Sequence, residues 1–456
     1  MSQKLNTPKG TRDYLPLDVR KRNYIFQIIS EAFEQFGYQP IETPSFELSS
    51  TLMGKYGDEG DRLIFRILNS GEKLKKADIS ALENDQLAKF AHSLSEKALR
   101  YDLTVPFARY VVQHQNDLTF PFKRYQIQPV WRADRPQHGR YQEFYQCDGD
   151  VVGSDSLRNE VELMRIIQRV LRRLNLPGFS IKLNNRKVLS GIAQVCGVEH
   201  ELIALTVALD KLDKIGKEAV IEELSSKGFT SQVLEKINPL FALEGTFEDR
   251  INQLRDYLSE SPIGLKGLEE ISFVFEKLKN EIAENETLEF EVTLARGLNY
   301  YTGMILEVKA SGIEMGSICG GGRYDDLTEL FGLKGLSGVG ISFGADRIYD
   351  ILNSLKLFPE HLSEGPELLL LHFSESSADQ CDAWAQQLRD LGKSVEVYPS
   401  ALKLQKQLKY ANDRGVQWVA FYGDVEIEQQ CVVLKNMHTG EQFTYDVKSW
   451  VADWLG

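Results

Sequence analysis

The 456-residue chain lacks several features that would assign it to a class at once. It has no run of about 18 apolar residues able to span a bilayer, and its N-terminal stretch MSQKLNTPKGTRDYLP has no apolar segment of the secretory type. Its five cysteines form no CxxC pair, which argues against a disulfide framework and against a structural zinc site. We therefore expect a soluble, cytoplasmic protein with ordinary thiols, no membrane association and no metal held by a protein cluster.

Positive charge is also scarce, because 53 Lys and Arg stand against 66 Asp and Glu, for a net charge of −13. This excludes the overall basic surface with which many proteins meet a nucleic acid. Two local basic segments remain, and the basic residues they contain are Lys123, Arg124, Arg132, Arg135 and Arg140 in the first, against the single acid Asp134, and Arg389, Lys393, Lys403, Lys406, Lys409 and Arg414 in the second. They could hold a nucleic acid at two places or be solvated surfaces, and charge alone leaves both open.

Length and local composition predict several domains. The chain is too long for one compact core, and its 42% hydrophobic and 26% charged residues are ordinary for a globular protein. Helix-like runs rich in Lys, Glu and Leu follow residue 186, whereas strands and helices alternate near the C-terminus. We predict a first domain in two parts, a helical insertion, a linker and a separate α/β domain, with the bounds 1–185 and 287–358, 186–286, 359–366 and 367–456.

Local patterns predict the elements of the first domain. Apolar residues at helical spacing indicate an amphipathic helix that Asp18 starts and Gly37 ends. The stretch YQPIETPSF contains Pro40 and Pro44, which restrict the backbone and favour an edge or interface strand. Alternating residues over 123–152, interrupted by a turn-forming loop, predict two antiparallel strands. Strand patterns return at residues 290–294 and 304–309.

The segment RYDLTVPFARY, residues 100–110, is the first of four that carry candidate site residues. Asp102 and Thr104 stand two positions apart and would point the same way from an extended chain. A carboxylate beside a hydroxyl can hold an ammonium group. The alternative is a turn or helix cap formed by Asp102 and Thr104.

The second segment, VWRADRPQHGRYQEFYQCDGD, offers groups for a phosphate and a base. Arg132 and Arg140 bracket its loop, and a guanidinium is well shaped to bind a phosphate bidentately. Phe144 could stack on a purine. The following strand carries three polar residues on one face, namely Gln146, Asp148 and Asp150. If buried, these acids need a cationic or hydrogen-bonding partner, and if exposed they form surface salt bridges.

The third and fourth segments combine an arginine, tyrosines and glycines. In LARGLNYYTGMILEV, Arg296 precedes the pair Tyr300 and Tyr301, which could form an aromatic, polar pocket or pack in the core. In SICGGGRYDDL and GVGISFGADRI, the glycines permit close approach of the backbone to a ligand, although most such runs are simple turns. Arg347 lies in a predicted helix behind Gly344.

Taken together and in this order, the segments resemble class II aminoacyl-tRNA synthetases and, within them, histidyl-tRNA synthetases, over nearly the whole chain. GYQPIETP resembles the first class II motif, the arginine hairpin the second, and GISFGADRI the third. RGLNYYTG and SICGGGRYDDL resemble the two histidine-specific segments. The resemblance implies an antiparallel sheet flanked by helices, a helical insertion, and a C-terminal anticodon-binding domain of the α/β class with a mixed sheet.

The resemblance also implies an activity and partners. We expect ATP-dependent activation of L-histidine to histidyl-adenylate, then transfer to the 3′ end of tRNA(His), with release of pyrophosphate and AMP. ATP is a substrate and Mg²⁺ the expected cofactor, and the first motif around Pro44 is expected to form a homodimer. A site that hydrogen-bonds both imidazole nitrogens rejects apolar analogues by a factor of about 10⁴, so we expect no editing domain.

Residue roles follow from the same resemblance. Two arginines are expected to act on the reacting carboxylate and the α-phosphate: Arg296 and Arg132. Histidine is expected to contact Asp102, Thr104, Gln146, Asp150, Tyr300 and Tyr301, with Asp150 and Tyr301 on the imidazole. ATP is expected to contact Arg132, Asp134, Arg140, Phe144 and Arg347. For tRNA the expected contacts are Arg135 and Gln137 on the acceptor stem and, near the anticodon, Lys403, Lys406 and Lys409.

Several positions depart from the common family pattern. Asp102 and Asp150 are each one methylene shorter than the glutamates that many members have, and the third glycine of CGGG replaces a frequent alanine. We interpret these joint changes as a coordinated, eukaryote-like sub-type. Asp134 stands where a glutamate is usual, which makes its role toward adenine less direct. Asn299 replaces the usual aspartate of RGLDYY, and we have no physical account of that change.

Two alternatives remain for the function. One is a non-catalytic paralogue, such as the synthetase-like regulatory subunit of the first enzyme of histidine biosynthesis. Such chains tend to lose the catalytic arginines and the C-terminal domain, whereas Arg132, Arg296 and Arg347 are present here. The other is an RNA-binding module without an active site. Histidine-dependent exchange of pyrophosphate into ATP would distinguish them.

Overall fold

The computed structural model describes residues 5–137, 139–295, 300–363 and 365–455. The chain divides into two compact units, Met1–Leu357 and Phe358–Gly456. Across the described ranges, no helix is both long and apolar enough to cross a membrane.

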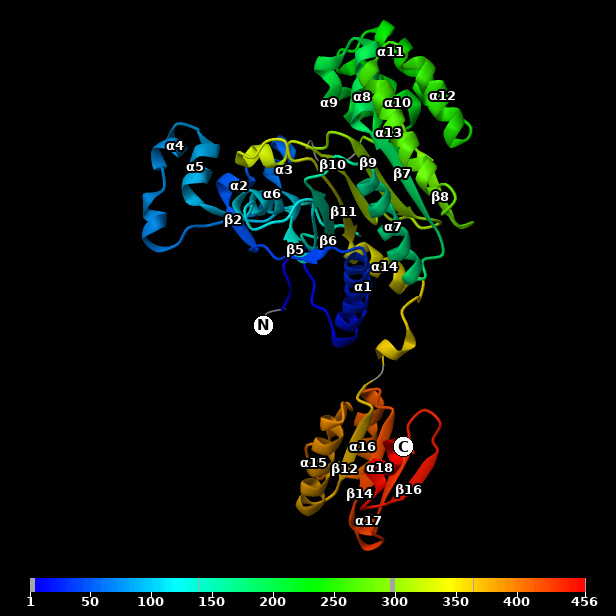
Figure 1. Ribbon diagram of the computed structural model, residues 1–456. Helices are drawn as coiled ribbons and strands as arrows, with labels where there is room; N and C mark the ends of the chain where they lie inside the picture. Colours follow the sequence, from blue (N-terminus) through cyan, green and yellow to red (C-terminus); the bar gives the residue numbers. More distant parts are fainter. Residues whose placement is uncertain (1–4, 138, 296–299, 364, 456) are drawn as a thin grey trace. The chain divides into compact units, whose positions relative to one another are not determined.

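The first unit is built around an eight-stranded mixed sheet in the order β1-β5-β6-β11-β10-β9-β7-β8 (Figure 1). Its strands are β1 (Gln39–Pro40), β5 (Phe122–Trp131), β6 (Glu143–Val152), β7 (Phe179–Asn185), β8 (Glu286–Phe290), β9 (Met304–Ala310), β10 (Cys319–Tyr324) and β11 (Gly338–Gly344). From β5 to β7 all neighbours are antiparallel, whereas the edge strands β1 and β8 pair in parallel. The predicted hairpin and the edge strand at Pro40 are thus confirmed. The predicted strand at 290–294 was placed too late, because the paired residues end at Phe290.

Helix α1 (Pro16–Gln35) packs beside α7 (Arg158–Arg173) and α14 (Ala345–Ser354). Its buried side chains recur at helical spacing, as the apolar pattern predicts. Phe33 packs so closely on β6 that a Cβ at Gly149 would lie 2.0 Å from its ring. The helix begins two residues before Asp18, whose carboxylate accepts a hydrogen bond of 3.1 Å from the Leu15 backbone N–H. Gly37, at φ +80°, follows the end of the helix.

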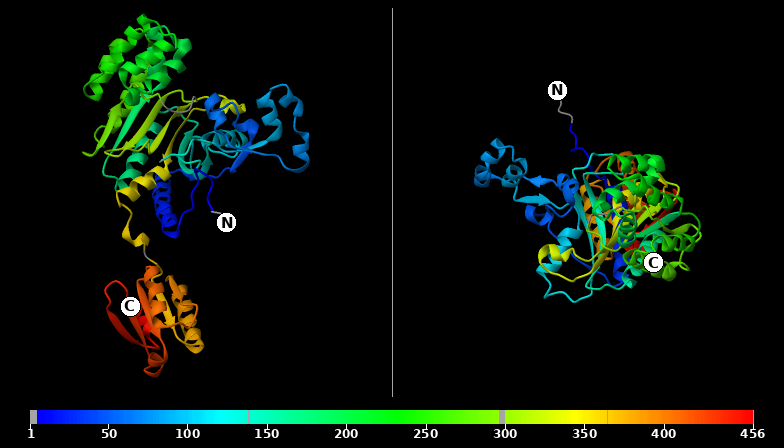
Figure 2. Two further views of the ribbon diagram at one scale, coloured as in Figure 1. Left: turned by 180° about the vertical axis from the view of Figure 1, so that it is seen from behind. Right: turned by 90° about the horizontal axis from the view of Figure 1, so that it is seen from above.

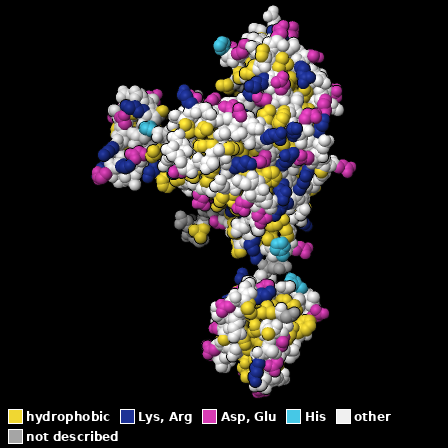
Figure 3. Space-filling view, viewed as in Figure 1, with side chains coloured by type: hydrophobic (Ala, Val, Ile, Leu, Met, Phe, Trp, Pro, Cys, Tyr) yellow, Lys and Arg dark blue, Asp and Glu magenta, His cyan; other side chains and the backbone are white. Residues whose placement is uncertain are grey.

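Helices fill the segment between β7 and β8, and Figures 1 and 2 show them gathered at one end of the sheet. They are α8 (Arg186–Cys196), η2 (Glu199–Glu201), α9 (Leu202–Leu209), α10 (Leu212–Ser226), α11 (Ser231–Ile237), η3 (Asn238–Ala242), α12 (Phe247–Tyr257) and α13 (Pro262–Leu278). α8 and α13 approach so closely that a Cβ at Gly191 would lie 2.6 Å from the Cα of Gly264. On the face seen in Figure 3, positive and negative side chains intermingle over these helices.

The segment between β1 and β5 forms a smaller substructure around a three-stranded sheet in the order β2-β4-β3. Its elements are β2 (Phe46–Leu48), α2 (Ser49–Leu52), α3 (Gly57–Arg62), β3 (Arg66–Ile67), η1 (Gly71–Lys76), α4 (Ile79–Glu83), α5 (Leu87–Leu94), β4 (Lys97–Leu99) and α6 (Thr104–Gln113). Tyr56, Tyr101 and Phe107 lie in its core. A further short helix, η4 (Thr328–Phe331), packs against α6.

The second unit has a five-stranded mixed sheet in the order β13-β12-β14-β15-β16, which agrees with the predicted α/β class. Its elements are η5 (Glu360–Ser363), β12 (Leu368–His372), α15 (Glu375–Asp390), β13 (Val395–Val397), α16 (Leu404–Asp413), β14 (Trp418–Tyr422), α17 (Asp424–Glu428), β15 (Cys431–Asn436), β16 (Gln442–Asp446) and α18 (Trp450–Leu455). Trp384 and Trp450 meet edge to face in its core, with ring centroids 5.2 Å apart.

Candidate functional site

The candidate site lies on one face of the central sheet, where the strand register aligns two rows of residues. One row, read from β5 to β9, consists of Gln126, Asp148, Ser342, Gly320 and Glu307. The next row on the same face consists of Arg124, Asp150, Gly340, Gly322 and Ile305. A Cβ at Gly340 would lie 1.9 Å from Oδ1 of Asp150, so the absence of a side chain there makes room for the acid. The glycine-rich stretches, which a turn could also have explained, are strands β10 and β11.

Two adjoining cavities open on this face. We call the first the arginine cavity, and its lining includes Arg132, Asp134, Arg140, Phe144, Asp346 and Arg347. We call the second the acid cavity, and its lining includes Asp102, Thr104, Tyr300, Tyr301 and Glu307. The residues common to both linings are Arg132, Gln146, Ser317, Gly320 and Ser342. Residues from all four sequence segments therefore meet in one continuous site.

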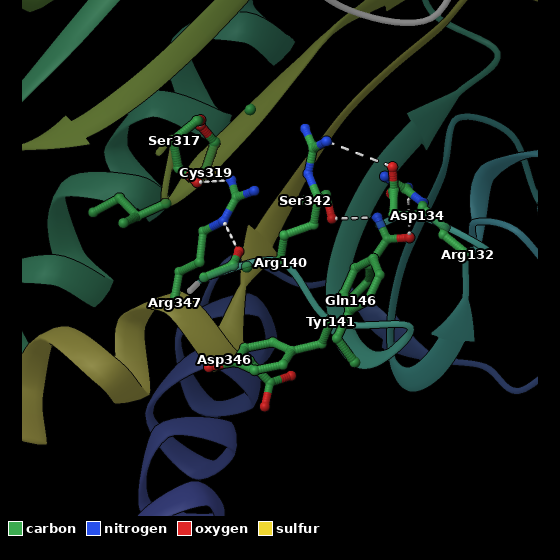
Figure 4. A pocket seen from close by; sticks show the side chains of 15 residues that line it. Arg132, Asp134, Arg140, Tyr141, Gln146, Ser317, Cys319, Ser342, Asp346 and Arg347 are labelled. Carbon is green, nitrogen blue, oxygen red and sulfur yellow. Dashed lines mark hydrogen bonds and ion pairs between the residues drawn. The ribbon is translucent and has the colours of Figure 1, made fainter. Parts of the chain in front are cut away.

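Backbone carbonyls orient the guanidinium groups of Arg347 and Arg132 in the arginine cavity, and Figure 4 shows the two contacts of Arg347. Arg347 donates from Nε to the Gly139 carbonyl at 2.9 Å and from a terminal nitrogen to the Ser317 carbonyl at 2.6 Å. Arg132 donates from Nε to the Tyr101 carbonyl at 3.0 Å, and its guanidinium carbon lies 5.2 Å from the centre of the Phe144 ring. Carbonyl oxygens carry no formal charge, so these hydrogen bonds orient the two guanidinium groups without neutralising them.

An acid at the rim of this cavity ties it to the N-terminal segment. Asp346 accepts hydrogen bonds from the Tyr145 backbone N–H at 2.9 Å, from the Tyr14 hydroxyl at 2.6 Å and from Arg12 at 2.9 Å. The Arg12 guanidinium also lies 4.3 Å from the centre of the Tyr141 ring. We did not predict roles for Arg12 and Tyr14, since no local pattern marks residues whose partner is more than 330 positions away.

Asp102 forms the helix cap that was one interpretation of its segment, and it also lines the acid cavity. Its Oδ1 accepts a hydrogen bond of 3.1 Å from the Val105 backbone N–H, as in a helix cap, and one of 2.8 Å from the Tyr56 hydroxyl. Its Oδ2 is buried without a hydrogen-bond partner among the residues described. Burial raises the pKa of Asp102, and the bond from Tyr56 opposes that rise. The extended backbone assumed in the prediction was wrong, because Thr104 begins α6, yet both side chains line the acid cavity.

A buried arginine forms an ion pair with one acid of β6 and acts electrostatically on the other. Arg124 is 0% exposed and lies 2.6 Å from Oδ2 of Asp150, whose Oδ1 accepts a 2.6 Å hydrogen bond from the Tyr324 hydroxyl. Burial raises the pKa of Asp148 to about 7, while the positive charge of Arg124 opposes this rise and the negative charge of Asp150 adds to it. Arg124 therefore does not belong to a basic surface segment, and that interpretation was wrong. Pairing across the predicted hairpin could have found it, because Arg124 stands directly opposite Asp150.

The remaining predicted residues lie as follows. Tyr300 and Tyr301 both line the acid cavity, with ring centroids 5.0 Å apart. Burial and the charge of Asp150 raise the pKa of Tyr301. Gln146 donates to the Ser342 hydroxyl at 2.8 Å, and Arg140 lies 3.6 Å from Asp134. Asp150 lines neither cavity in the part of the chain that is described, and Arg296 and Asn299 lie outside that part.

The residues predicted to contact tRNA are exposed in both units. Arg135 and Gln137 lie in the loop between β5 and β6, whose tip is closed by backbone hydrogen bonds between Gln137 and Arg140 of 3.2 and 2.9 Å. In the second unit, Lys403 immediately precedes α16, and Lys406 and Lys409 lie within it. Lys409 pairs with Asp413 on the same helix. In the ranges that are described, no group of three or more His, Cys, Asp or Glu side chains could hold a metal ion.

The central sheet with its flanking helices, followed by the mixed-sheet second unit, is the fold of class II aminoacyl-tRNA synthetases. The crystal structure of histidyl-tRNA synthetase from Nostoc sp. PCC 7120 matches it with a TM-score of 0.80, at 29% identity and over 99% of each chain. A Bacillus halodurans structure described as an ATP phosphoribosyltransferase regulatory subunit/histidyl-tRNA synthetase shares the fold, with a TM-score of 0.73 at 21% identity, over 93% of this chain and 99% of that one.

Family models and sequence relatives identify the family within this class. A model described as histidyl-tRNA synthetase matches residues 10–81 and 72–348, and one described as anticodon binding domain matches residues 367–453. The histidine–tRNA ligase of Christiangramia forsetii is 56% identical over 447 residues, which is 98% of each chain. The chain belongs to the histidyl-tRNA synthetase family.

Proposed function

We propose that this protein is a histidine–tRNA ligase, which activates L-histidine with ATP and transfers it to the 3′ end of tRNA(His). The observation that carries this proposal is the continuity of the two cavities, since Arg132 and Gln146 line both. An amino acid in one cavity and a triphosphate in the other would meet at Arg132. The family membership and the full-length similarity to a curated ligase support the same activity.

The reaction needs no nucleophile from the protein. The histidine carboxylate attacks the α-phosphorus, the bond to the β-phosphate oxygen breaks, and pyrophosphate leaves with that electron pair. The protein must bring two anions together and stabilise the charge that grows on the phosphoryl oxygens. We assign this task to Arg132 and Arg296. In the second step a ribose hydroxyl of the terminal adenosine attacks the acyl-adenylate, and AMP leaves.

We assign the two cavities to the two substrates. In the acid cavity, Asp102, Thr104 and Gln146 would hold the α-ammonium group, Tyr301 would contact the imidazole, and Tyr300 would close the pocket. Asp150 would contact the imidazole from behind this cavity, once its carboxylate turns from Arg124 and Tyr324 toward the ligand. In the arginine cavity, Phe144 would stack on adenine, Asp134 would lie toward it, and Arg140 and Arg347 would contact phosphates. The acceptors in one cavity and the cations in the other suit an ammonium group and a polyphosphate.

Magnesium is the cofactor that we propose. Proteins usually bind this ion through one or two carboxylates together with substrate phosphates. Among the described residues no group of three or more His, Cys, Asp or Glu side chains could hold the ion, so the substrate phosphates would supply most of its ligands. When bound, the ion would neutralise part of the charge on the phosphates, which complements the arginines.

We further propose how the rest of the chain serves this activity. The bounds 1–185 and 287–358 would enclose the catalytic domain, 186–286 the helical insertion, 359–366 a linker and 367–456 the anticodon-binding domain. The exposed positions that would contact tRNA are Arg135, Gln137, Lys403, Lys406 and Lys409. The segment around Pro44, beside the edge strand β1, would form a homodimer in the cytoplasm.

The shortened acids Asp102 and Asp150 define the sub-type that we propose for the histidine pocket. Tyr56 donates a hydrogen bond to Asp102, whereas Arg124 and Tyr324 contact Asp150. These contacts fix the positions of two acids whose side chains are short. The relatives named above are bacterial, so they give no support to calling this sub-type eukaryote-like.

Histidine-dependent exchange of radiolabelled pyrophosphate into ATP, followed by aminoacylation of tRNA(His), tests the proposal. We expect both activities in the wild type and a large loss of exchange in Arg296→Ala. Arg165→Ala is the matched control, because Arg165 pairs with Glu281 on the surface of α7. A wild type without exchange would favour the regulatory paralogue, and unchanged exchange in Arg296→Ala would overturn the role of that arginine.

A further inference from the structure

Tyr56 is a buried tyrosine directly behind the acid cavity. It precedes α3 and is 4% exposed, and it is absent from the lining of both cavities in the described part of the chain. Its hydroxyl donates a hydrogen bond of 2.8 Å to Oδ1 of Asp102. The phenol therefore contacts a residue of the cavity without facing the cavity itself.

The two carboxylate oxygens of Asp102 differ in their hydrogen-bond partners. Oδ1 receives both donors, the Tyr56 hydroxyl and the Val105 backbone N–H at 3.1 Å. Oδ2 is buried and has no hydrogen-bond partner in the described residues, although Asp102 lines the acid cavity. Two donors on one oxygen restrict rotation of the carboxylate and leave the other oxygen for a ligand. A buried acceptor without a partner is costly, and an ammonium group would remove that cost.

We propose that Tyr56 is a positioning residue that holds Asp102 ionised, with one oxygen committed to the phenol and the other left for the α-ammonium group of the amino acid. This inference rests on the proposed function. Without the phenol, Asp102 would keep only the backbone donor, and its carboxylate would be free to rotate and more easily protonated.

The ring of Tyr56 also packs behind Arg132, which lines both cavities, through the ring of Tyr101. It lies 4.7 Å from the ring of Tyr101, measured between centroids, and Arg132 lies 4.3 Å from the centre of the Tyr101 ring. Arg132 also donates to the Tyr101 carbonyl at 3.0 Å. The tyrosine pair thus lies behind both the acid for the ammonium group and the arginine at the junction. Removing only the hydroxyl keeps the ring contact and isolates the effect on Asp102.

The test compares Tyr56→Phe with the wild type for two ligands. L-histidine carries the α-ammonium group, and 3-(imidazol-4-yl)propanoic acid lacks it. Hydrogen bonds to charged groups make large contributions to affinity, so we expect the KM for histidine to rise about 10-fold or more. The inhibition constant of the propanoic acid and the KM for ATP should change less than about 2-fold.

Tyr257→Phe is the matched control. Its hydroxyl is also partly buried and donates a 3.0 Å hydrogen bond to the Lys236 carbonyl within the helical insertion. Tyr257→Phe should lower the thermal stability but leave the KM for histidine and the inhibition constant of the propanoic acid unchanged. Equal weakening of both ligands in Tyr56→Phe, or no weakening of histidine, would overturn the inference. A wild type that neither exchanges pyrophosphate nor binds histidine would instead contradict the proposed function.

The pH dependence supplies a second readout. The charged and titratable groups that act on Asp102 or share its surroundings are Tyr56, Arg124, Arg132, Asp148, Tyr300 and Tyr301. The acid-side limb of 1/KM for histidine should move to higher pH in Tyr56→Phe, because Asp102 loses a donor. Should that variant unfold, 3-fluorotyrosine at position 56 keeps the shape and has a more acidic hydroxyl. The limb should then move to lower pH, and an unmoved limb would overturn the inference.

Discussion

The two adjoining cavities differ in how exposed the charged side chains at or behind them are. In the arginine cavity the side chain of Arg140 is 49% exposed, and its neighbours come from a loop and the first turn of a helix. Behind the acid cavity, central strands hold the ion pair of Arg124 and Asp150, whose side chains are 0% and 3% exposed. Solvated cations can attract a polyphosphate at little cost to folding, whereas buried acids need fixed partners. The exposed positive charge of the arginine cavity can attract a ligand, whereas the buried ion pair behind the acid cavity fixes the positions of side chains.

The largest effect should come from removing the buried cation. Arg124→Met leaves Asp150 buried without its ion-pair partner, and we expect it to lower the free energy of unfolding by about 3–5 kcal/mol. Urea denaturation at neutral pH measures this loss. The double variant Arg124→Met/Asp150→Asn is the control and should recover part of the stability. A loss below about 1 kcal/mol would contradict the comparison, because it would place Arg124 among the inexpensive surface charges.

Arg132, at the junction of the cavities, should show the largest catalytic effect. Arg132→Ala should reduce kcat for pyrophosphate exchange about 10²–10³-fold, the usual loss when a donor to a developing oxyanion is removed. The unfolding free energy should change less than in Arg124→Met, since Arg132 has no acid within salt-bridge distance among the residues described here. Steady-state exchange and urea denaturation of the same preparations measure both. Unchanged kcat would remove Arg132 from the reaction.

Asp148 should make the stability of the folded protein sensitive to pH. Its pKa rises from 3.8 to about 7 in the folded protein, so between these values the folded state retains a proton that the unfolded state has lost. This acid therefore lowers stability progressively as the pH rises from about 4 to 7, and its full penalty is present above 7. Asp148→Asn should be more stable than the wild type by about 2 kcal/mol at pH 8, and by much less at pH 4. Equal differences at both pH values in urea denaturation would contradict the shift.

The smallest effect should come from the phenol that lines the acid cavity. Tyr301→Phe removes one hydroxyl, and we expect the KM for histidine to rise about 10-fold, with little change in the KM for ATP. Exchange kinetics at varied histidine and at varied ATP measure the two constants. Similar increases in both would argue against an imidazole contact and would weaken the division of the two cavities between the two substrates.

Local sequence patterns predicted the strands and helices that carry the site, but they did not predict most of the contacts between its side chains. Periodicity predicted the hairpin of β5 and β6, and the helix behind Gly344 is α14. The substructure between β1 and β5 was missed because its elements are short and stabilised by contacts among themselves. Tyr56 went unnoticed for the same reason, since its partner Asp102 is 46 positions away. Arg124 was misassigned because net charge along the sequence does not report burial.

The sequence by itself determines the order of the motifs and the residue types available for the site. These depend on short-range spacing and on composition, which a linear chain displays directly. Only the tertiary structure decided which acid faces a cavity and which faces a buried arginine. Asp102 and Asp150 are both short acids, but one keeps an oxygen without a partner beside a cavity, and the other is enclosed by Arg124 and Tyr324. That difference arises from burial and from the partners Tyr56 and Tyr324, which lie 46 and 174 positions from their acids and which local sequence does not reveal.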